Sequence, residues 1–353
     1  MAEHVEMRLY TAGQLKDWLL HGLAVEGLSE ELIDKCRAYA LVKNPFVTDD
    51  MSLVSALFVN GGVGAYTYVF PDKMNRPQRT IYWNTTLYVN PQYEGRGYAY
   101  CVIAAICELY GDDYFDLDAA EASVENLKYQ GLTVTYLSQY VFRQKSIKGN
   151  SLKARAARTW ERLRLRRCSK EAVLRRRLTQ GNYELQYVNC VDDETYTFIK
   201  NHAEADLFLR RQETFDWILQ HPFMQESPLH GRVKHRCQFA SAMPVFRMYG
   251  IVVRRQGTIV GFLVMRATQD ECAVKYIYYD PMAKEDVFLA VAEHLLAQPK
   301  SIFFTADKQL HDFVAQYNLF AHDMIYNKSF AYPNGFEYDE NLRVQAGDGD
   351  NVT

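Results

Sequence analysis

The sequence predicts an α/β (α+β) protein made of two domains built on one plan. Its 353 residues are 48% hydrophobic, which is enough apolar material for two ordinary cores. The order of helices, strand hairpin, strand, helix, strand, helix and strand appears twice along the chain. We therefore expect a domain over residues 1–142, a basic helical linker over 143–180, a second domain over 181–336, and a flexible acidic tail over 337–353.

The first half opens with helical spacing of apolar residues over 12–42, which ends at Asn44-Pro45. Gly61-Gly62 is suited to a tight turn between two strands. The remaining elements of this half should be strands over 53–60, 64–70, 80–90, 113–117 and 132–142, and helices over 97–110 and 124–129. In the strand over 80–90, alternation should put five side chains on one face: Ile81, Trp83, Thr85, Leu87 and Val89.

The second half repeats this order with different residues, and Gln256-Gly257 is the turn of its hairpin. Its helices are expected over 192–200, 210–220, 285–296 and 309–317. Its strands are expected over 249–255, 258–267, 271–279, 301–306 and 324–331.

Residues 143–177 form a strongly basic segment with 14 basic and 2 acidic side chains, a net charge of +12 in a chain of net charge −3. Helical spacing should place four arginines on one face: Arg155, Arg158, Arg162 and Arg166. Leu152, Ala156, Trp160 and Leu163 should then pack on a domain. The segment is either a solvated linker or a contact with an anionic membrane face, a sugar nucleotide or RNA.

A loop rich in glycine, over residues 90–97, lies between the predicted strand 80–90 and the predicted helix 97–110. Gly95 and Gly97 allow a tight turn and leave their amides unhindered. Several N–H groups at a helix start can hold a pyrophosphate. The loop is therefore a candidate anion site, and we expect the amides of residues 92–97 to hold the anion.

The pattern Gln92-x-x-Gly95-x-Gly97, preceded by Leu87-Tyr88-Val89-x-Pro91, resembles the coenzyme A signature of the GNAT superfamily of acyl-CoA N-acyltransferases. The resemblance implies two GNAT-like domains, each a mixed, mostly antiparallel sheet flanked by helices. Over the second half, Arg210-Arg211, Trp217 and His221-Pro222 are similar to tandem GNAT-like proteins of bacterial surface-glycan loci.

This resemblance implies acyl transfer, most simply acetyl transfer, from acetyl-CoA to a primary amine, with an amino sugar or a sugar nucleotide as an acceptor. Asn126 and Tyr129 resemble the family's asparagine and tyrosine beside the cofactor arm, and Tyr129 is the implied acid for the leaving thiolate. Four carboxylates near the expected helix 124–129 could act as general base: Asp116, Asp118, Glu121 and Glu125. The implied cofactor residues are Leu87, Val89, Gln92, Tyr93, Glu94, Gly95, Arg96, Gly97, Tyr98 and Asn126.

The second loop, over 279–284, has no glycine and contains Pro281, so we expect one coenzyme A per chain. The seven cysteines show no metal-ligand spacing, and we expect no metal. We expect a cytoplasmic enzyme without a nucleic-acid partner, because no signal peptide, membrane span or overall basic charge is visible. The resemblance to proteins of surface-glycan loci implies a bacterial one. Two other functions stay open: an aminoacyl-tRNA-dependent transferase of the Fem type, and a non-catalytic coenzyme A-binding protein.

Overall fold

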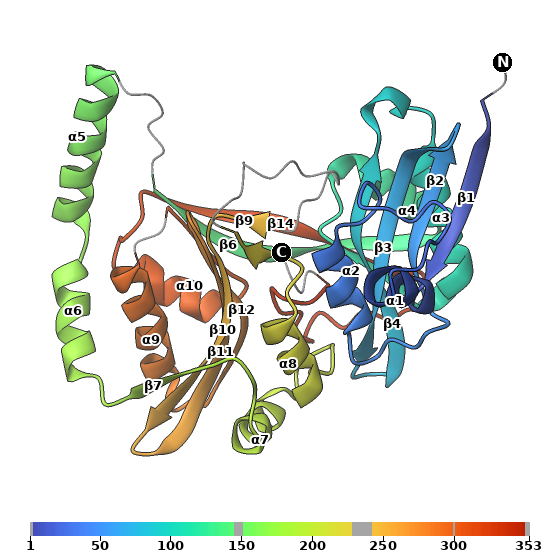
Figure 1. The fold of residues 1–353 in the computed structure, drawn as a ribbon. Coiled ribbons are helices and arrows are strands. Elements are labelled where there is room, and N and C mark those ends of the chain that lie inside the picture. The colour runs from blue at the N-terminus through green and yellow to red at the C-terminus, as the bar shows by residue number, and fades with distance from the viewer. Residues whose placement is uncertain (1–2, 145–150, 228–241, 299–300, 350–353) are drawn as a thin grey trace. The chain divides into compact units, whose positions relative to one another are not determined.

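A computed structural model describes residues 3–144, 151–227, 242–298 and 301–349 (Figure 1). The chain divides into two compact units. Unit 1 consists of residues 1–137, 205–244 and 328–353, and unit 2 of residues 138–204 and 245–327. This division differs from the contiguous domains expected from the sequence, because unit 1 includes residues from the middle and the end of the chain.

Unit 1 is built on a sheet with the strand order β1-β2-β3-β4-β5-β14. Neighbouring strands are antiparallel except β4 and β5, which are parallel. The strands are β1 (Val5–Thr11), β2 (Ser52–Val59), β3 (Gly62–Met74), β4 (Arg79–Val89), β5 (Tyr114–Leu117) and the end of β14 (His322–Pro333). The helices are α1 (Ala12–Leu20), α2 (Lys35–Val42), α3 (Tyr98–Tyr110), α4 (Glu121–Tyr129) and α8 (Gln212–Gln220), with short 3₁₀ turns at Pro91–Tyr93 and Gly111–Asp113. A small separate pair is formed by β8 (Gln225–Glu226) and β9 (Ala242–Met243).

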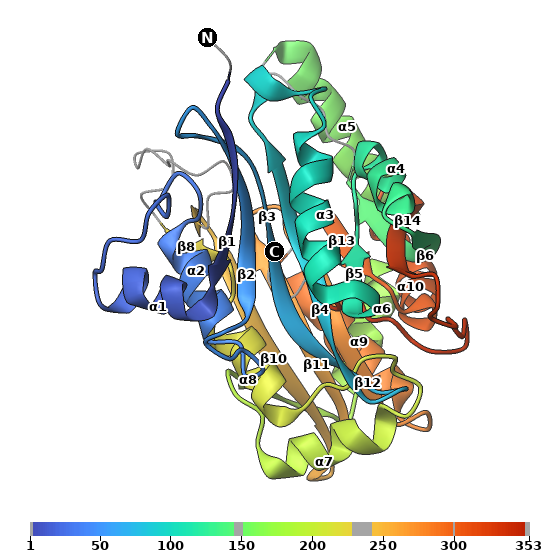
Figure 2. The ribbon, with the colours of Figure 1, turned by 90° about the vertical axis from the view of Figure 1, so that its right-hand side faces the viewer.

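Helices cover both faces of this sheet, as the alternation along β3 shows. Val69 packs with Ile103 and Ile106 of α3. Phe70, on the other face, lies 5.7 Å from the ring of Trp217 of α8. Figure 2 shows α3 across one face of the strands, and Figure 1 shows α1 and α2 on the other. A strand buried on both faces is mostly apolar, as β3 is from Ala65 to Phe70. The hydroxyl group of its polar residue, Thr67, donates to the carbonyl oxygen of Thr86 at 2.6 Å.

The strand β4 contains a β-bulge that the sequence did not indicate. Asn84 pairs with Val69 and Thr86 pairs with Tyr68, so Thr85 is an extra residue on β4. One inserted residue moves the following side chains to the opposite face. The expectation of one shared face is therefore wrong: Trp83 packs on Phe208, whereas Leu87 and Val89 pack with the side chains of the α3 face.

The segments 205–220 and 342–349 belong to unit 1 because of a buried ion-pair cluster. Arg210 bonds Asp72 of β3 and Asp348, each at 2.5 Å, and all three side chains are about 1–2% exposed. Arg343 bonds Asp206 at 2.5 Å. Of the tail expected to be flexible, residues 345–349 are buried, and Asp348 is bonded there to the buried Arg210, whereas Asp339, Glu340 and Asn341 are exposed.

Unit 2 repeats the plan of unit 1 with the strand order β7-β10-β11-β12-β13-β6. Its fourth and fifth strands in this order, β12 and β13, are parallel, as are the fourth and fifth strands of unit 1. Its strands are β7 (Glu184–Val188), β10 (Phe246–Arg255), β11 (Thr258–Thr268), β12 (Glu271–Tyr279), β13 (Ile302–Thr305) and the end of β6 (Leu132–Arg143). Its helices are α5 (Leu152–Cys168), α6 (Glu171–Gln180), α7 (Asp193–His202), α9 (Lys284–Ala297) and α10 (Lys308–Ala315). The fold duplication expected from the sequence is thus present as a repeated strand order.

The last strand of each sheet comes from the other half of the sequence. The end of β14 pairs with β5 through Phe330 and Leu117, and the end of β6 pairs with β13 through Phe142 and Phe303. The sequence predicted both strands but not these partners. The local pattern predicts that each segment is a strand, but it does not select the sheet edge with which the strand pairs.

The basic segment forms two helices, α5 and α6, and its packing differs from the expectation. Leu152 is 81% exposed, Trp160 69% and Leu163 50%. The buried positions of α5 are Ala154 and Glu161. The apolar stripe therefore does not pack on a domain. None of the described helices is long and apolar enough to cross a bilayer.

Candidate active site

The loop after β4 has the local structure that its sequence predicted. The side chain of Asn90 accepts a hydrogen bond from the amide of Gln92 at 3.2 Å and opens a 3₁₀ turn. Gly95 and Gly97 have φ angles of 78° and 80°, in the left-handed region that favours glycine. A Cβ added at either glycine would meet nothing within 4 Å, so the loop faces open space.

Five amides of this loop and helix start have no hydrogen-bond acceptor within the part of the chain that the structure describes. They belong to Gly95, Gly97, Tyr98, Ala99 and Tyr100. Of the amides expected to hold an anion, over 92–97, only those of Gly95 and Gly97 are among them, because the other four donate to acceptors within the loop. The N-cap of α3 is Gly97, which offers no side chain to cap them, and its first turn contains no acidic residue. Unsatisfied amides and the positive end of the helix dipole together favour an anion. The residues present therefore fit the pyrophosphate of coenzyme A.

The other predicted cofactor residues surround this loop. Leu87 and Val89 are partly buried against the α3 face. The rings of Tyr93 and Tyr98 lie 5.8 Å apart. Arg96 lies over Tyr93 at 5.3 Å and bonds Glu3 at 2.5 Å. Glu94 and Gln92 are exposed at the surface of the loop.

Beside the loop, the parallel strands β4 and β5 pair over three residues and then diverge. The pairing runs from Tyr82 with Tyr114 to Asn84 with Asp116, although β4 continues to Val89. The bulge residue Thr85 follows the last pair directly. Among the described residues, the edge of β4 over 85–89 therefore has no strand on the β5 side, and this edge has room for a long ligand bound at the loop.

Asp116 is the one of the four candidate bases that the structure buries. The side-chain amide of Asn84 donates a hydrogen bond to the carboxylate of Asp116 at 2.5 Å. Asp116 is only 5% exposed. Burial raises the pKa of Asp116 to about 6; the nearby Asp118 acts in the same direction, and Asn84 and Lys328 oppose it. A buried carboxyl group with a pKa near neutral pH is suited to general-base chemistry.

The remaining candidate carboxylates are exposed, and Glu125 bonds Lys128 of its own helix at 3.0 Å. Asp118 has a φ of 70°, an uncommon value for a residue other than glycine, directly after β5. The residue that sequence reasoning missed is Asn84. Asn84 and Asp116 lie on neighbouring strands and are 32 positions apart in the sequence, and no local sequence motif indicates their contact.

Tyr129, the predicted thiolate acid, is 78% exposed at the end of α4. Its ring meets that of Tyr100 edge-on at 5.4 Å, so it lies beside the first turn of α3. Asn126 is one turn earlier on α4 and partly buried. The structure thus brings α4 close to the helix start, while the roles of both residues stay predictions.

The corresponding loop of unit 2 is built differently. The amide of Asp280 donates to Val260, and Met282 and Ala283 donate to the side chain and the carbonyl of Asp280, at 2.8 to 3.0 Å. Pro281 has no N–H, and Glu285 and Asp286 add negative charge to the first turn of α9. These features disfavour an anion at this loop.

No family model matches the chain, and no curated protein matches its sequence. Its structure is similar to a GCN5-related N-acetyltransferase from Kribbella flavida, with a TM-score of 0.51 and 11% identity over 93% of this chain and 71% of that one. A GCN5-related N-acetyltransferase from Anabaena variabilis gives a TM-score of 0.50 and 8% identity, over 93% and 72%.

A third neighbour is a GCN5-related glucosamine N-acetyltransferase region of a fungal multi-domain β-N-acetylglucosaminidase. It has a TM-score of 0.50 and 9% identity, over 94% of this chain and 38% of that one. At such identities the likeness shows the fold alone. The chain therefore has the GNAT fold, a mixed and mostly antiparallel sheet flanked by helices, as the sequence predicted. Groups of three or more metal-ligating side chains are absent from the described residues.

Proposed function

We propose that unit 1 transfers an acyl group from an acyl-CoA, most simply acetyl-CoA, to a primary amine. The observation that carries this proposal is the set of unbonded amides at Gly95 and Gly97–Tyr100, directly beside the diverging strands β4 and β5. A thioester supplies the activated acyl carbon. The GNAT fold supports the same function, since its structural neighbours are named as N-acetyltransferases.

In this proposal the chain supplies binding, orientation and proton transfer. The loop amides hold the pyrophosphate, and the unpaired edge of β4 orients the pantetheine arm and donates to the carbonyl oxygen as negative charge develops on it. Asp116 accepts the proton of the attacking amine through a water molecule, because its carboxylate is buried. Tyr129 donates a proton to the leaving thiolate.

Two measurements test the proposal. Calorimetry with acetyl-CoA should give saturable binding, and a thiol-release assay with a panel of primary amines should identify an acceptor. Amino sugars come first in the panel, because the stretch from Arg210 to Pro222 resembles tandem GNAT-like proteins of surface-glycan loci. Binding without thiol release from any amine would favour a non-catalytic coenzyme A-binding protein, and no binding at all would refute the proposal.

A further inference from the structure

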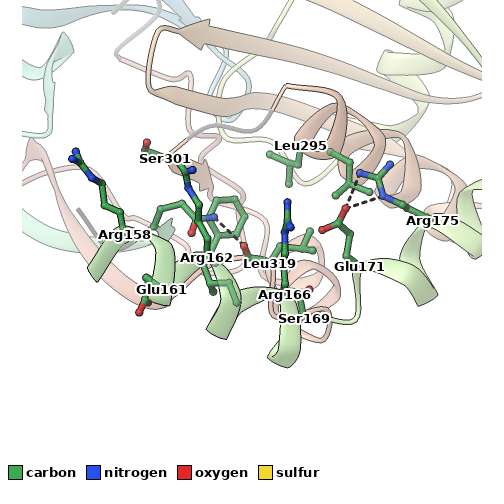
Figure 3. Close-up of a pocket in the computed structure, with 14 residues that line it drawn as sticks. Arg158, Glu161, Arg162, Arg166, Ser169, Glu171, Arg175, Leu295, Ser301 and Leu319 are labelled. Carbon is green, nitrogen blue, oxygen red and sulfur yellow. Dashed lines mark hydrogen bonds and ion pairs between the residues drawn. The ribbon is translucent and has the colours of Figure 1, made fainter. Parts of the chain in front are cut away.

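Unit 2 contains a pocket of about 670 Å³ between the basic helices and the body of the unit (Figure 3). One wall is formed by α5 and α6. The opposite wall is formed by the end of α9, Ser301 and the segment at Leu319 and Phe320. Cavities of this volume hold small molecules of cofactor size. The pocket has no part in the proposed acyl transfer, which belongs to unit 1.

The α5 wall presents a row of arginines. Arg158, Arg162 and Arg166 recur at every fourth residue, so they lie on one face of the helix and line the pocket. Each step of four residues advances about 6 Å along a helix, so the row extends over about 12 Å. Figure 3 shows their side chains running in the same direction from α5.

These three arginines are not neutralised by carboxylates in the described part of the chain. Glu161 also lines the pocket, but Arg164 bonds it at 2.6 Å from the same helix. Glu171 is bonded by Arg175 at 2.7 Å. No ion pair of Arg158, Arg162 or Arg166 is present among described residues, so the pocket is left with positive charge.

The facing wall is apolar and fixed in place. Leu295 is 5% exposed, and Leu296, Leu319 and Phe320 lie beside it. The Gln144 amide donates to the carbonyl of Leu319 at 3.0 Å, which holds this wall against the end of β6. An apolar wall opposite a row of guanidinium groups suits a ligand that has phosphates on one side and an aromatic or aliphatic part on the other.

We propose that this pocket binds a phosphate ester of the nucleoside diphosphate class. Its phosphates contact Arg158, Arg162 and Arg166, and its base or other apolar part lies on Leu295, Leu319 and Phe320. A phospholipid has the same combination of phosphate and apolar groups. The exposed Trp160 on the outer side of α5 makes a lipid surface the rival source, and the experiment separates the two.

The test titrates uridine diphosphate and inorganic pyrophosphate into the full chain by calorimetry at physiological salt. R162E/R166E removes two pocket arginines. K153E/R167E is the matched control, because it makes the same charge change at two exposed positions of α5 outside the pocket. Saturable binding of uridine diphosphate should weaken about 100-fold in R162E/R166E, since each charge-assisted hydrogen bond is worth about tenfold or more. It should change less than about threefold in K153E/R167E, because these two side chains do not line the pocket and salt screens their charges over the longer distance.

Three outcomes would overturn the proposal. One is the absence of wild-type binding to uridine diphosphate at millimolar concentration. Another is equal weakening in both variants, which would indicate diffuse charge rather than a site. The third is binding to phosphatidylglycerol vesicles that survives R162E/R166E and is lost in W160E, without nucleotide binding, which would assign α5 to a lipid surface. Circular dichroism and thermal melts of each variant exclude loss of folding as the cause.

Discussion

Replacing Asp116 by asparagine should lower activity and raise stability at once. Asparagine keeps the shape of the side chain and can still accept the hydrogen bond from Asn84, but it carries no charge and binds no proton at neutral pH. If Asp116 is the general base, kcat/KM at pH 7.5 should fall about 100-fold or more, in the range typical of losing a positioned base. Thiol release with the acceptor identified for the unmodified chain measures this loss.

The stability change follows from the pKa of Asp116, which burial raises from 3.8 to about 6. A raised pKa means that the folded chain binds this proton more tightly than the unfolded chain. The folded state is therefore destabilised as the pH rises from about 4 to about 6, and the full penalty is present above pH 6. A shift of this size corresponds to an upper limit of about 3 kcal/mol. D116N should recover part of it at pH 8 and little at pH 4, as denaturant titrations at the two pH values would show.

The same pKa predicts the acid limb of the pH–rate profile of the unmodified chain. Activity should fall tenfold for each pH unit below about 6, because only the ionised carboxylate accepts a proton. D118N is the matched control: Asp118 is exposed and two residues away, and asparagine tolerates its left-handed φ. Asp116 is not the general base if the D116N variant is as active as the D118N variant. The same conclusion follows if D116N has measurable activity and its pH–rate profile still falls below about pH 6.

Three other predictions concern the cofactor loop and the buried ion pairs. G95E should weaken acetyl-CoA binding at least about tenfold in calorimetry, because it puts an anionic side chain where the pyrophosphate is expected. G257E in unit 2 is the control, since Gly257 has a φ of 81° and Gly95 a φ of 78°, so the two substitutions cause similar backbone strain. The G257E variant should bind acetyl-CoA normally. Acetyl-CoA should bind at one molecule per chain. The measurement uses R162E/R166E, so that the arginine-lined pocket of unit 2 does not contribute. A ratio near two would show that the loop over 279–284 also binds acetyl-CoA. R210M should destabilise unit 1 by about 3–5 kcal/mol in denaturant titrations, since it leaves the buried carboxylates of Asp72 and Asp348 without their ion-pair partner. R211M, whose pair with Glu213 is exposed, should unfold like the unmodified chain.

The sequence predicted those features that depend on neighbouring residues. The loop is such a case, since the amides of Gly95 and Gly97–Tyr100 are left unbonded by glycines and by a helix start that are themselves local. Helix α3 was expected over 97–110 and is found at Tyr98–Tyr110, and β4 was expected over 80–90 and is found at Arg79–Val89. Apolar periodicity and glycine positions contain enough information for such elements.

Features that depend on distant partners were not predicted. The composition of the acidic tail is typical of a solvated segment. Asp348 is nevertheless buried, because it bonds Arg210, which lies 138 positions earlier in the sequence. The strand β1 was missed because it lies at the sheet edge, where Val5 and Leu9 are 45% and 38% exposed and its apolar pattern is weak. The bulge at Thr85 depends on the register between β3 and β4, and a single sequence contains no marker of register.

The exchange of the two last strands affects how unit 1 can be studied. Asp116 pairs with Ala331 of β14, and the amide of Asp118 donates to the carbonyl of Ser329 at 2.8 Å. The backbone around the proposed base is therefore held by residues more than 200 positions later in the chain. A fragment that ends at residue 142 contains the whole loop over 90–97, but it lacks the strand next to β5. It also lacks Arg210 and Asp348, so the buried Asp72 loses its ion-pair partner. Loss of activity in such a fragment would follow from the missing strand even if every catalytic residue were present. The tests of Asp116 and of the loop therefore require the full chain with single substitutions.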